Sequence, residues 1–226
     1  MSIALLATIA LFCSTSKQSF SDPSIDKTVM KDVFAGDPFP KPWIDPGFKK
    51  IVFIYSPNFN HRPENAIVDT IVLHSTVIPT LEVTAHAFYR KESEVSSHFI
   101  IGKDGSVIES VNPYYRAWHA GRSRDFLKRD NLNNFSIGIE LVNLNNGKDP
   151  YPEPQIEALR SLILSLKYQY PLKYITSHKY IAIPIGRKID PAGFPWKTMD
   201  GLGLEVIHNG HAPTEPGDPK PTTHHQ

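Results

Sequence analysis

Three segments of the chain each carry a side chain that can bind a divalent metal ion. His74 and His178 each end an apolar run rich in β-branched residues, and Asp190 follows a pair of basic residues further along the chain. Two imidazoles and one carboxylate leave the fourth position of a tetrahedral ion open, as in catalytic rather than structural zinc sites. Water in that position has a lowered pKa, so hydroxide becomes available for nucleophilic attack. No compact metal motif joins the three residues, so spacing alone leaves a structural role for each of them open.

Strand and helix patterns alternate over residues 64–197, and these elements would position the metal-capable side chains. Runs of β-branched residues predict strands, and apolar residues at helical spacing predict helices. The pair Asp104-Gly105 between two strand-like runs is a hairpin signal. Strands are expected over residues 67–73, 97–101, 106–111, 135–142 and 174–177, and helices over residues 80–91 and 154–170. The predicted fold class is α/β, a single domain with a central mixed β-sheet flanked by helices and the metal site at the strand ends.

The composition of the chain excludes several classes of protein. With 24 Lys and Arg against 23 Asp and Glu the formal net charge is +1, so the basic surplus typical of nucleic-acid binding is missing. The single cysteine excludes an intramolecular disulfide and a zinc site built from several thiolates. Any metal must therefore be held by histidines and carboxylates, and we predict no nucleic-acid partner and no protein partner.

Residues 1–13 resemble the start of an exported protein. The run from Ile3 to Phe12 is almost entirely apolar, and it is shorter than the roughly 20 residues that span a membrane. Its length is typical of a secretory signal, and the only cysteine, Cys13, follows directly, as in bacterial lipoprotein signals. We expect export to the periplasm, with attachment to the outer membrane through a lipidated Cys13. The bulky Phe12 and the absence of Lys or Arg before the run leave a plain signal as the alternative.

Six motifs occur in order across the central part of the chain. They are the strand that ends in His74, Ser97-His98-Phe99-Ile100-Ile101 with Asp104-Gly105, Ala117-Trp118-His119-Ala120-Gly121, Ser136-Ile137-Gly138-Ile139-Glu140-Leu141, Ser177-His178, and Arg187-Lys188-Ile189-Asp190-Pro191. With these motifs the chain resembles the zinc-dependent N-acetylmuramoyl-L-alanine amidases, the family that includes anhydro-muropeptide amidases and peptidoglycan recognition proteins. The exported single-domain bacterial members look closest. The resemblance spans residues 67–197, and the runs around Trp118 and Glu140 are its most specific parts.

The resemblance implies a role for five residues of the site. His74, His178 and Asp190 match the zinc ligands of the family. Glu140 matches the acid that activates the metal-bound water or moves its proton, which a carboxylate beside such a water can do as a general base. Lys188 matches a cation that stabilises the oxyanion, since a fixed positive charge favours the negative charge that develops on a carbonyl oxygen.

Two further residues are expected at the substrate. His119 matches a residue that lines the substrate-binding cleft, and Trp118 is predicted either to form the cleft wall or to pack in the core. His98, within a predicted strand, is expected to pack or to form hydrogen bonds beneath the site. The segment between His178 and Asp190 is longer than is usual in the family, which affects the expected loop conformation but removes no ligand.

The sequence therefore predicts a zinc-dependent hydrolase. Its expected reaction is hydrolysis of the amide bond between N-acetylmuramic acid, in its ordinary or its 1,6-anhydro form, and L-alanine in peptidoglycan or muropeptides, for cell-wall turnover or recycling. A non-catalytic peptidoglycan recognition module of the same fold is the first alternative, although such modules typically lack a zinc ligand. A structural surface lipoprotein with an inert metal is the second, and its sign would be direct metal binding by His119 or Glu140.

The expected domain organisation follows from composition and from the resemblance. Residues 1–13 form the signal or lipoprotein-like segment, and residues 14–63 form a Pro-rich N-terminal extension with one edge strand near residues 51–55. Residues 64–208 form the amidase domain. The tail of residues 209–226, rich in Pro, Gly, Thr and His, is predicted to be disordered.

Overall fold

The structure, a computed structural model, describes residues 51–208 of the chain. The lipoprotein-like segment with Cys13, most of the Pro-rich extension and the tail of residues 209–226 lie outside the described residues, so the expectations for them stay predictions. No helix in the described part is long and apolar enough to cross a membrane.

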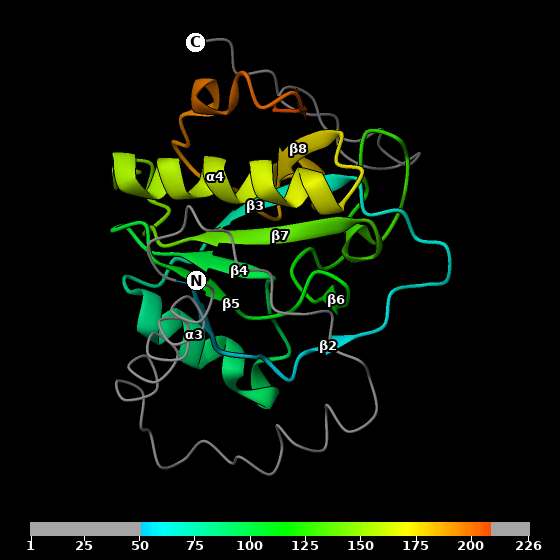
Figure 1. Cartoon of the computed structure of the whole chain (residues 1–226), viewed down its shortest axis with the longest axis horizontal. Helices are drawn as coiled ribbons and strands as arrows, with labels where there is room; N and C mark the ends of the chain where they lie inside the picture. Colours follow the sequence, from blue (N-terminus) through cyan, green and yellow to red (C-terminus); the bar gives the residue numbers. More distant parts are fainter. Residues whose placement is uncertain (1–50, 209–226) are drawn as a thin grey trace, which may run out of the picture. The chain divides into compact units, whose positions relative to one another are not determined.

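A seven-stranded mixed β-sheet forms the centre of the described part (Figure 1). Its order is β1-β5-β4-β7-β3-β8-β9, in which β4 and β5 form an antiparallel hairpin and every other neighbouring pair is parallel. The strands are Ile51–Phe53 (β1), Thr70–Ser75 (β3), Phe99–Ile101 (β4), Val107–Glu109 (β5), Ser136–Leu141 (β7), Tyr174–Ser177 (β8) and Glu205–Val206 (β9). Two short strands, Phe59–Asn60 (β2) and Arg116–Ala117 (β6), form a separate antiparallel pair. The predicted α/β class with a mixed sheet is confirmed.

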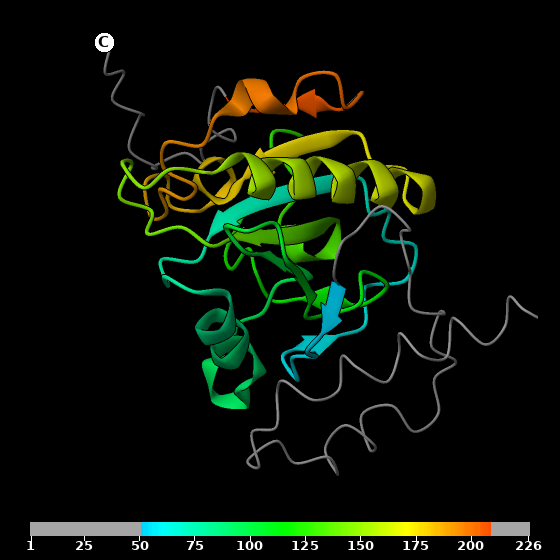
Figure 2. The same cartoon turned by 60° about the vertical axis from the view of Figure 1, so that its left-hand side comes forward.

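Helices α3 (Leu81–Tyr89) and α4 (Glu153–Gln169) flank the sheet, and α4 runs along it in both views (Figure 1 and Figure 2). Thr80 caps α3, because its side-chain oxygen accepts a hydrogen bond from the Val83 N–H. Pro154 lies in the first turn of α4, where its missing N–H costs nothing. The shorter helical elements are α5 (His178–Ile181) and the 3-10 turns Lys91–Ser93, Leu132–Asn134 and Trp196–Met199.

Strand β3 differs from the predicted strand of residues 67–73. Ile67 is 60% exposed and precedes the strand, which continues beyond residue 73 to Ser75. The strand extends this far because its last two residues pair in register with Glu140 and Leu141 of β7. A β-branched run marks the presence of a strand, whereas pairing with a neighbour decides where the strand begins and ends.

One face of β3 carries the first candidate metal ligand. Since side chains alternate along a strand, Val72 and His74 project to the same face. Val72 packs with Ala120, Leu132 and Ile181 in a buried cluster. The loop before β7 and the short α5 therefore cover this face beside His74.

Candidate active site

The parallel strands β3, β7 and β8 bring their carboxyl ends to one edge of the sheet. His74 is the next-to-last residue of β3, and His178 follows directly after β8. Glu140 of β7 is the register partner of His74, so both side chains project to the same face. In open α/β sheets, ligands bind outside the carboxyl ends of the strands.

Three candidate ligand atoms meet at this edge, one each from His74, His178 and Asp190. Nδ1 of His74 lies 3.1 Å from Nδ1 of His178 and 3.3 Å from Oδ2 of Asp190, and the remaining pair is 3.2 Å apart. Zinc ligands about 2.0–2.1 Å from a tetrahedral ion lie roughly 3.3–3.4 Å from one another, so the three atoms fit one ion. Within the described residues, these three side chains form a group that could hold one metal ion. All three are buried.

The ionisation of these residues suits metal binding. Burial raises the pKa of Asp190, but hydrogen bonds with His178 and His74 outweigh it and hold that pKa well below its usual range, so the carboxylate is ionised. Burial lowers the pKa of His74 to about 4, against the opposing hydrogen bond with Asp190, so this imidazole is neutral near pH 7. An ionised carboxylate and a neutral imidazole are the forms that coordinate metals.

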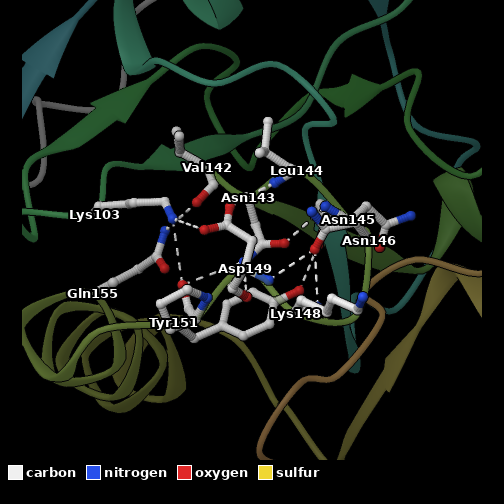
Figure 3. A network of polar contacts seen from close by, with 12 residues as sticks. Lys103, Val142, Asn143, Leu144, Asn145, Asn146, Lys148, Asp149, Tyr151 and Gln155 are labelled. Atoms are coloured by element: carbon white, nitrogen blue, oxygen red, sulfur yellow. Dashed lines mark hydrogen bonds and ion pairs between the residues drawn. The ribbon is translucent and has the colours of Figure 1, made fainter.

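Backbone contacts on both sides hold Asp190 in place. The Lys179 N–H donates to the Asp190 carbonyl at 3.0 Å, and the Ala192 N–H donates to Asn145 Oδ1 at 2.7 Å. Asn145 belongs to the loop of residues 143–149, which is ordered by a network of polar contacts (Figure 3). Asp190 is therefore anchored to α5 on one side and to the loop after β7 on the other.

The long segment between His178 and Asp190 is tied to the loop that precedes β7. Arg187 Nε donates to the Ile183 carbonyl at 2.9 Å, and Arg187 Nη2 donates to the Arg122 carbonyl at 2.8 Å. With these contacts in place, Asp190 reaches the two histidines.

Glu140 has a carboxyl oxygen without a hydrogen-bond partner. Its Oε2 is buried and makes no hydrogen bond with the described residues. Burial first, and then the negative charge of Asp190, raise the pKa of Glu140 to about 8, while the half-buried Lys188 opposes this shift. A buried polar atom without a partner is rare in native proteins, so Glu140 fits a site that a bound metal and its water complete.

Residues 63–193 match the N-acetylmuramoyl-L-alanine amidase family. The chain belongs to this family. It is similar to the 1,6-anhydro-N-acetylmuramyl-L-alanine amidase AmpD of Haemophilus influenzae, with 31% identity over 165 residues that cover 64% of this chain and 87% of the relative. AmpD of Escherichia coli is 32% identical over 163 residues, which cover 62% of this chain and 85% of the relative.

Solved structures of amidases share the fold. A crystal structure of AmpD matches with a TM-score of 0.56 at 26% identity, covering 71% of this amidase and 98% of that chain. AmiD of E. coli, solved with anhydro-N-acetylmuramic acid-L-Ala-D-γ-Glu-L-Lys, matches with a TM-score of 0.55 at 27% identity, covering 64% of this amidase and 62% of AmiD. The predicted family and enzyme class are therefore confirmed, and with them the dependence of the family on a metal ion.

The two residues expected at the substrate lie in different surroundings. Trp118 of the amidase is half-buried, and its indole Nε1–H donates to Asn60 Oδ1 at 3.1 Å. His119 is only 8% exposed, and its Nδ1 lies 3.0 Å from Nε2 of His74. This is the side of the His74 ring that faces away from the ligand atoms, so His119 does not close the fourth position of the ion.

Arg62 is half-buried in the amidase. No pattern in the sequence indicates a role for this residue. Its Nη2 lies 3.1 Å from Nε2 of His98, which is buried as expected and accepts the Gly138 N–H at 2.9 Å through Nδ1. The Arg62 guanidinium also donates to four backbone carbonyls, those of Pro113, Asn133, Asn134 and Ser136. Arg62 and His98 therefore brace the start of β7 beneath the metal ligands.

A cavity of about 720 Å³ is rich in arginine, and its lining includes Gly121, which follows His119 and Ala120 in the chain. Arg116 and Arg122 line it together with Arg124, which binds the lining carboxylate Asp130 through two hydrogen bonds. Arg116 Nε is buried and makes no hydrogen bond with the described residues. Asn133, also in the lining, accepts hydrogen bonds from the backbone between β6 and β7 that covers the site. The cavity is therefore an electropositive space next to the backbone that carries His119 and Ala120.

Proposed function

We propose that this amidase is a zinc enzyme that hydrolyses the amide bond between the lactyl group of N-acetylmuramic acid and L-alanine, in cell-wall turnover or recycling. One observation carries the proposal. His74, His178 and Asp190 converge with ligand atoms spaced for one ion, and Glu140 projects to the same face as His74. Three protein ligands leave open the position that a catalytic zinc needs.

The roles of the residues follow from the chemistry of an amide. When bound, zinc would polarise the carbonyl group of the substrate and lower the pKa of a water molecule that it holds. Glu140 takes a proton from the attacking water and returns it to the leaving nitrogen. Lys188 stabilises the negative charge that develops on the carbonyl oxygen.

The proposed substrates are muropeptides, including those with 1,6-anhydro-N-acetylmuramic acid. The ligand bound to AmiD contains a γ-linked glutamate, and a γ-linkage leaves the α-carboxylate of that residue free. The cavity next to the segment of His119 and Ala120 fits an anionic stem peptide, because Arg116 and Arg122 place positive charge there. In this orientation the stem peptide extends from the metal ligands toward these two arginines.

Mass spectrometry of digested muropeptides tests the proposal. The purified protein is incubated with 1,6-anhydro and reducing-end muramyl peptides, with and without a chelator, and again after zinc is restored. We expect free stem peptide from the untreated and the restored protein, and none from the chelated protein. A protein that binds zinc and muropeptide but releases no peptide would instead be a recognition module.

We also propose that the protein is exported and that residues 64–208 form its amidase domain, to which the preceding residues 51–63 add β1, β2 and Arg62. The apolar run from Ile3 to Phe12, followed by Cys13, supports export to the periplasm with lipid attachment. Several acyl chains on one cysteine would give the stable anchoring that a single chain does not. Metabolic labelling with a fatty acid should mark the wild-type protein and not Cys13→Ser. Equal labelling of both would remove the claim of lipid attachment.

A further inference from the structure

His74 has two ring nitrogens, and each faces a different partner. Its Nδ1 is one of the three candidate ligand atoms and lies 3.1 Å from Nδ1 of His178 and 3.3 Å from Oδ2 of Asp190. Its Nε2 lies 3.0 Å from Nδ1 of His119. A nitrogen that binds a cation offers its lone pair, so the proton of the His74 ring must be on Nε2 and must be donated to His119.

The second ring nitrogen of His119, Nε2, is connected through Ser136 to a backbone carbonyl, which can only accept a hydrogen bond. This nitrogen lies 3.2 Å from Ser136 Oγ, and Ser136 Oγ donates to the Leu132 carbonyl at 2.5 Å. Because Ser136 gives its single proton to that carbonyl, it accepts the proton of His119 Nε2. His119 therefore donates through Nε2 and accepts through Nδ1. The carbonyl of Leu132 thus fixes the direction of every hydrogen bond up to His74.

The backbone that carries His119 also orients the second imidazole. Asn133 Oδ1 accepts the N–H groups of His119 at 3.1 Å and of Ala120 at 2.8 Å. The Ala120 carbonyl lies 3.1 Å from Nε2 of His178 and accepts its proton, which leaves the lone pair of His178 Nδ1 for the ion. Two adjacent residues therefore set the tautomers of both histidine ligands, one through its side chain and the other through its carbonyl.

Gly138 of β7 provides the space that the His119 ring occupies. A Cβ atom at this position would lie 2.4 Å from Cγ and 2.6 Å from Nδ1 of His119, and close-packed interiors leave no room for such an approach. The neighbours Ile137 and Ile139 are β-branched, as a strand favours, whereas a glycine inside a strand weakens it. The ring packed against the strand explains why a glycine is found there.

We propose that His119 is a positioning residue, seated on Gly138, that fixes the proton and the ring orientation of His74. The inference rests on the proposed function only in taking His74, His178 and Asp190 as the metal ligands. It assigns His119 to the support of the metal site, where the resemblance implied a residue of the substrate cleft. Outer partners of this kind typically change metal affinity about 10- to 100-fold when they are removed.

The zinc affinity of purified variants, measured by competition with a chromophoric chelator, tests the inference. His119→Leu leaves the Nε2–H of His74 buried without an acceptor, so zinc should bind roughly 10- to 100-fold more weakly. His119→Asn keeps an acceptor oxygen near the position of Nδ1 and should recover most of that loss. Gly138→Ala should also weaken zinc binding, because the added methyl group displaces the His119 ring.

A spectrum and a control separate positioning from general damage to the fold. The visible spectrum of the cobalt-substituted protein reports ligand geometry and should change in His119→Leu and in Gly138→Ala. Leu159→Ala, on the buried face of α4, should lower the stability of the fold while zinc affinity and the cobalt spectrum stay as in the wild type. If His119→Leu does not fold, Gly138→Ala and His119→Asn decide the question.

Two results would overturn the inference. The first is wild-type zinc affinity and a wild-type cobalt spectrum in folded Gly138→Ala or His119→Leu. The second is zinc binding by folded His119→Asn that is no stronger than that of His119→Leu. A wild-type protein that binds zinc with the expected dependence on His119 but cleaves no muropeptide would overturn the proposed function alone.

Discussion

Asp190→Ala is expected to lose its bound zinc and its amidase activity while it keeps the fold. Asp190 supplies the only negative charge among the three candidate ligands, and its Oδ2 lies 3.3 Å and 3.2 Å from Nδ1 of His74 and of His178. Loss of an outer partner costs about 10- to 100-fold in metal affinity, so loss of a ligand should exceed that range. Zinc content after dialysis and release of stem peptide are the two measurements.

Asp200→Ala is the matched control for this change, because Asp200 is an exposed aspartate at the end of the Trp196–Met199 turn. It should keep both zinc and activity. Urea unfolding of the metal-free proteins should show a cooperative transition for Asp190→Ala, since backbone groups anchor this segment to α5 and to the loop after β7. Stoichiometric zinc in dialysed Asp190→Ala would contradict the ligand assignment.

Residue patterns predict the main strands of the sheet, but not the shortest ones. The run of residues 174–177 predicts β8 with its observed bounds, and Asp104-Gly105 predicts the hairpin of β4 and β5. Both are local signals. β2, β6 and β9 have two residues each, too few for a period-two pattern. Their partners lie far away in the chain, so only the folded structure reveals these strands.

The residue types of the site are predictable from the sequence, whereas the orientation of its rings is not. The resemblance selects His74, His178 and Asp190 as a set, and their ligand atoms lie together in the structure. A motif does not indicate which side of a neighbouring ring a residue occupies, so the contact between His119 and Nε2 of His74 could not be predicted. Arg62 has hydrogen-bond partners up to 74 residues away, so no short window of sequence contains its contacts.

Glu140→Gln is expected to bind zinc as the wild type does and to cleave almost no muropeptide. Glutamine has the shape of glutamate but cannot take up a proton. It can therefore neither accept a proton from the attacking water nor deliver one to the leaving nitrogen. General acid–base catalysis typically contributes roughly 100- to 10,000-fold, and we expect a loss at the upper end because one group acts twice. Glu140→Ala should behave in the same way, since Glu140 is outside the group of three candidate ligands.

Lys188→Ala is expected to lower the turnover number by about 100- to 1,000-fold, the range that loss of one oxyanion partner costs. The change in KM should be smaller, because the charge of Lys188 acts mainly when the carbonyl oxygen has become negative. Lys173→Ala, which removes an exposed lysine before β8, is the matched control and should leave both constants unchanged. Cleavage by Glu140→Gln at the wild-type rate would mean that another group moves the proton. A Lys188→Ala variant with only a raised KM would mean that Lys188 binds the substrate and does not stabilise the transition state.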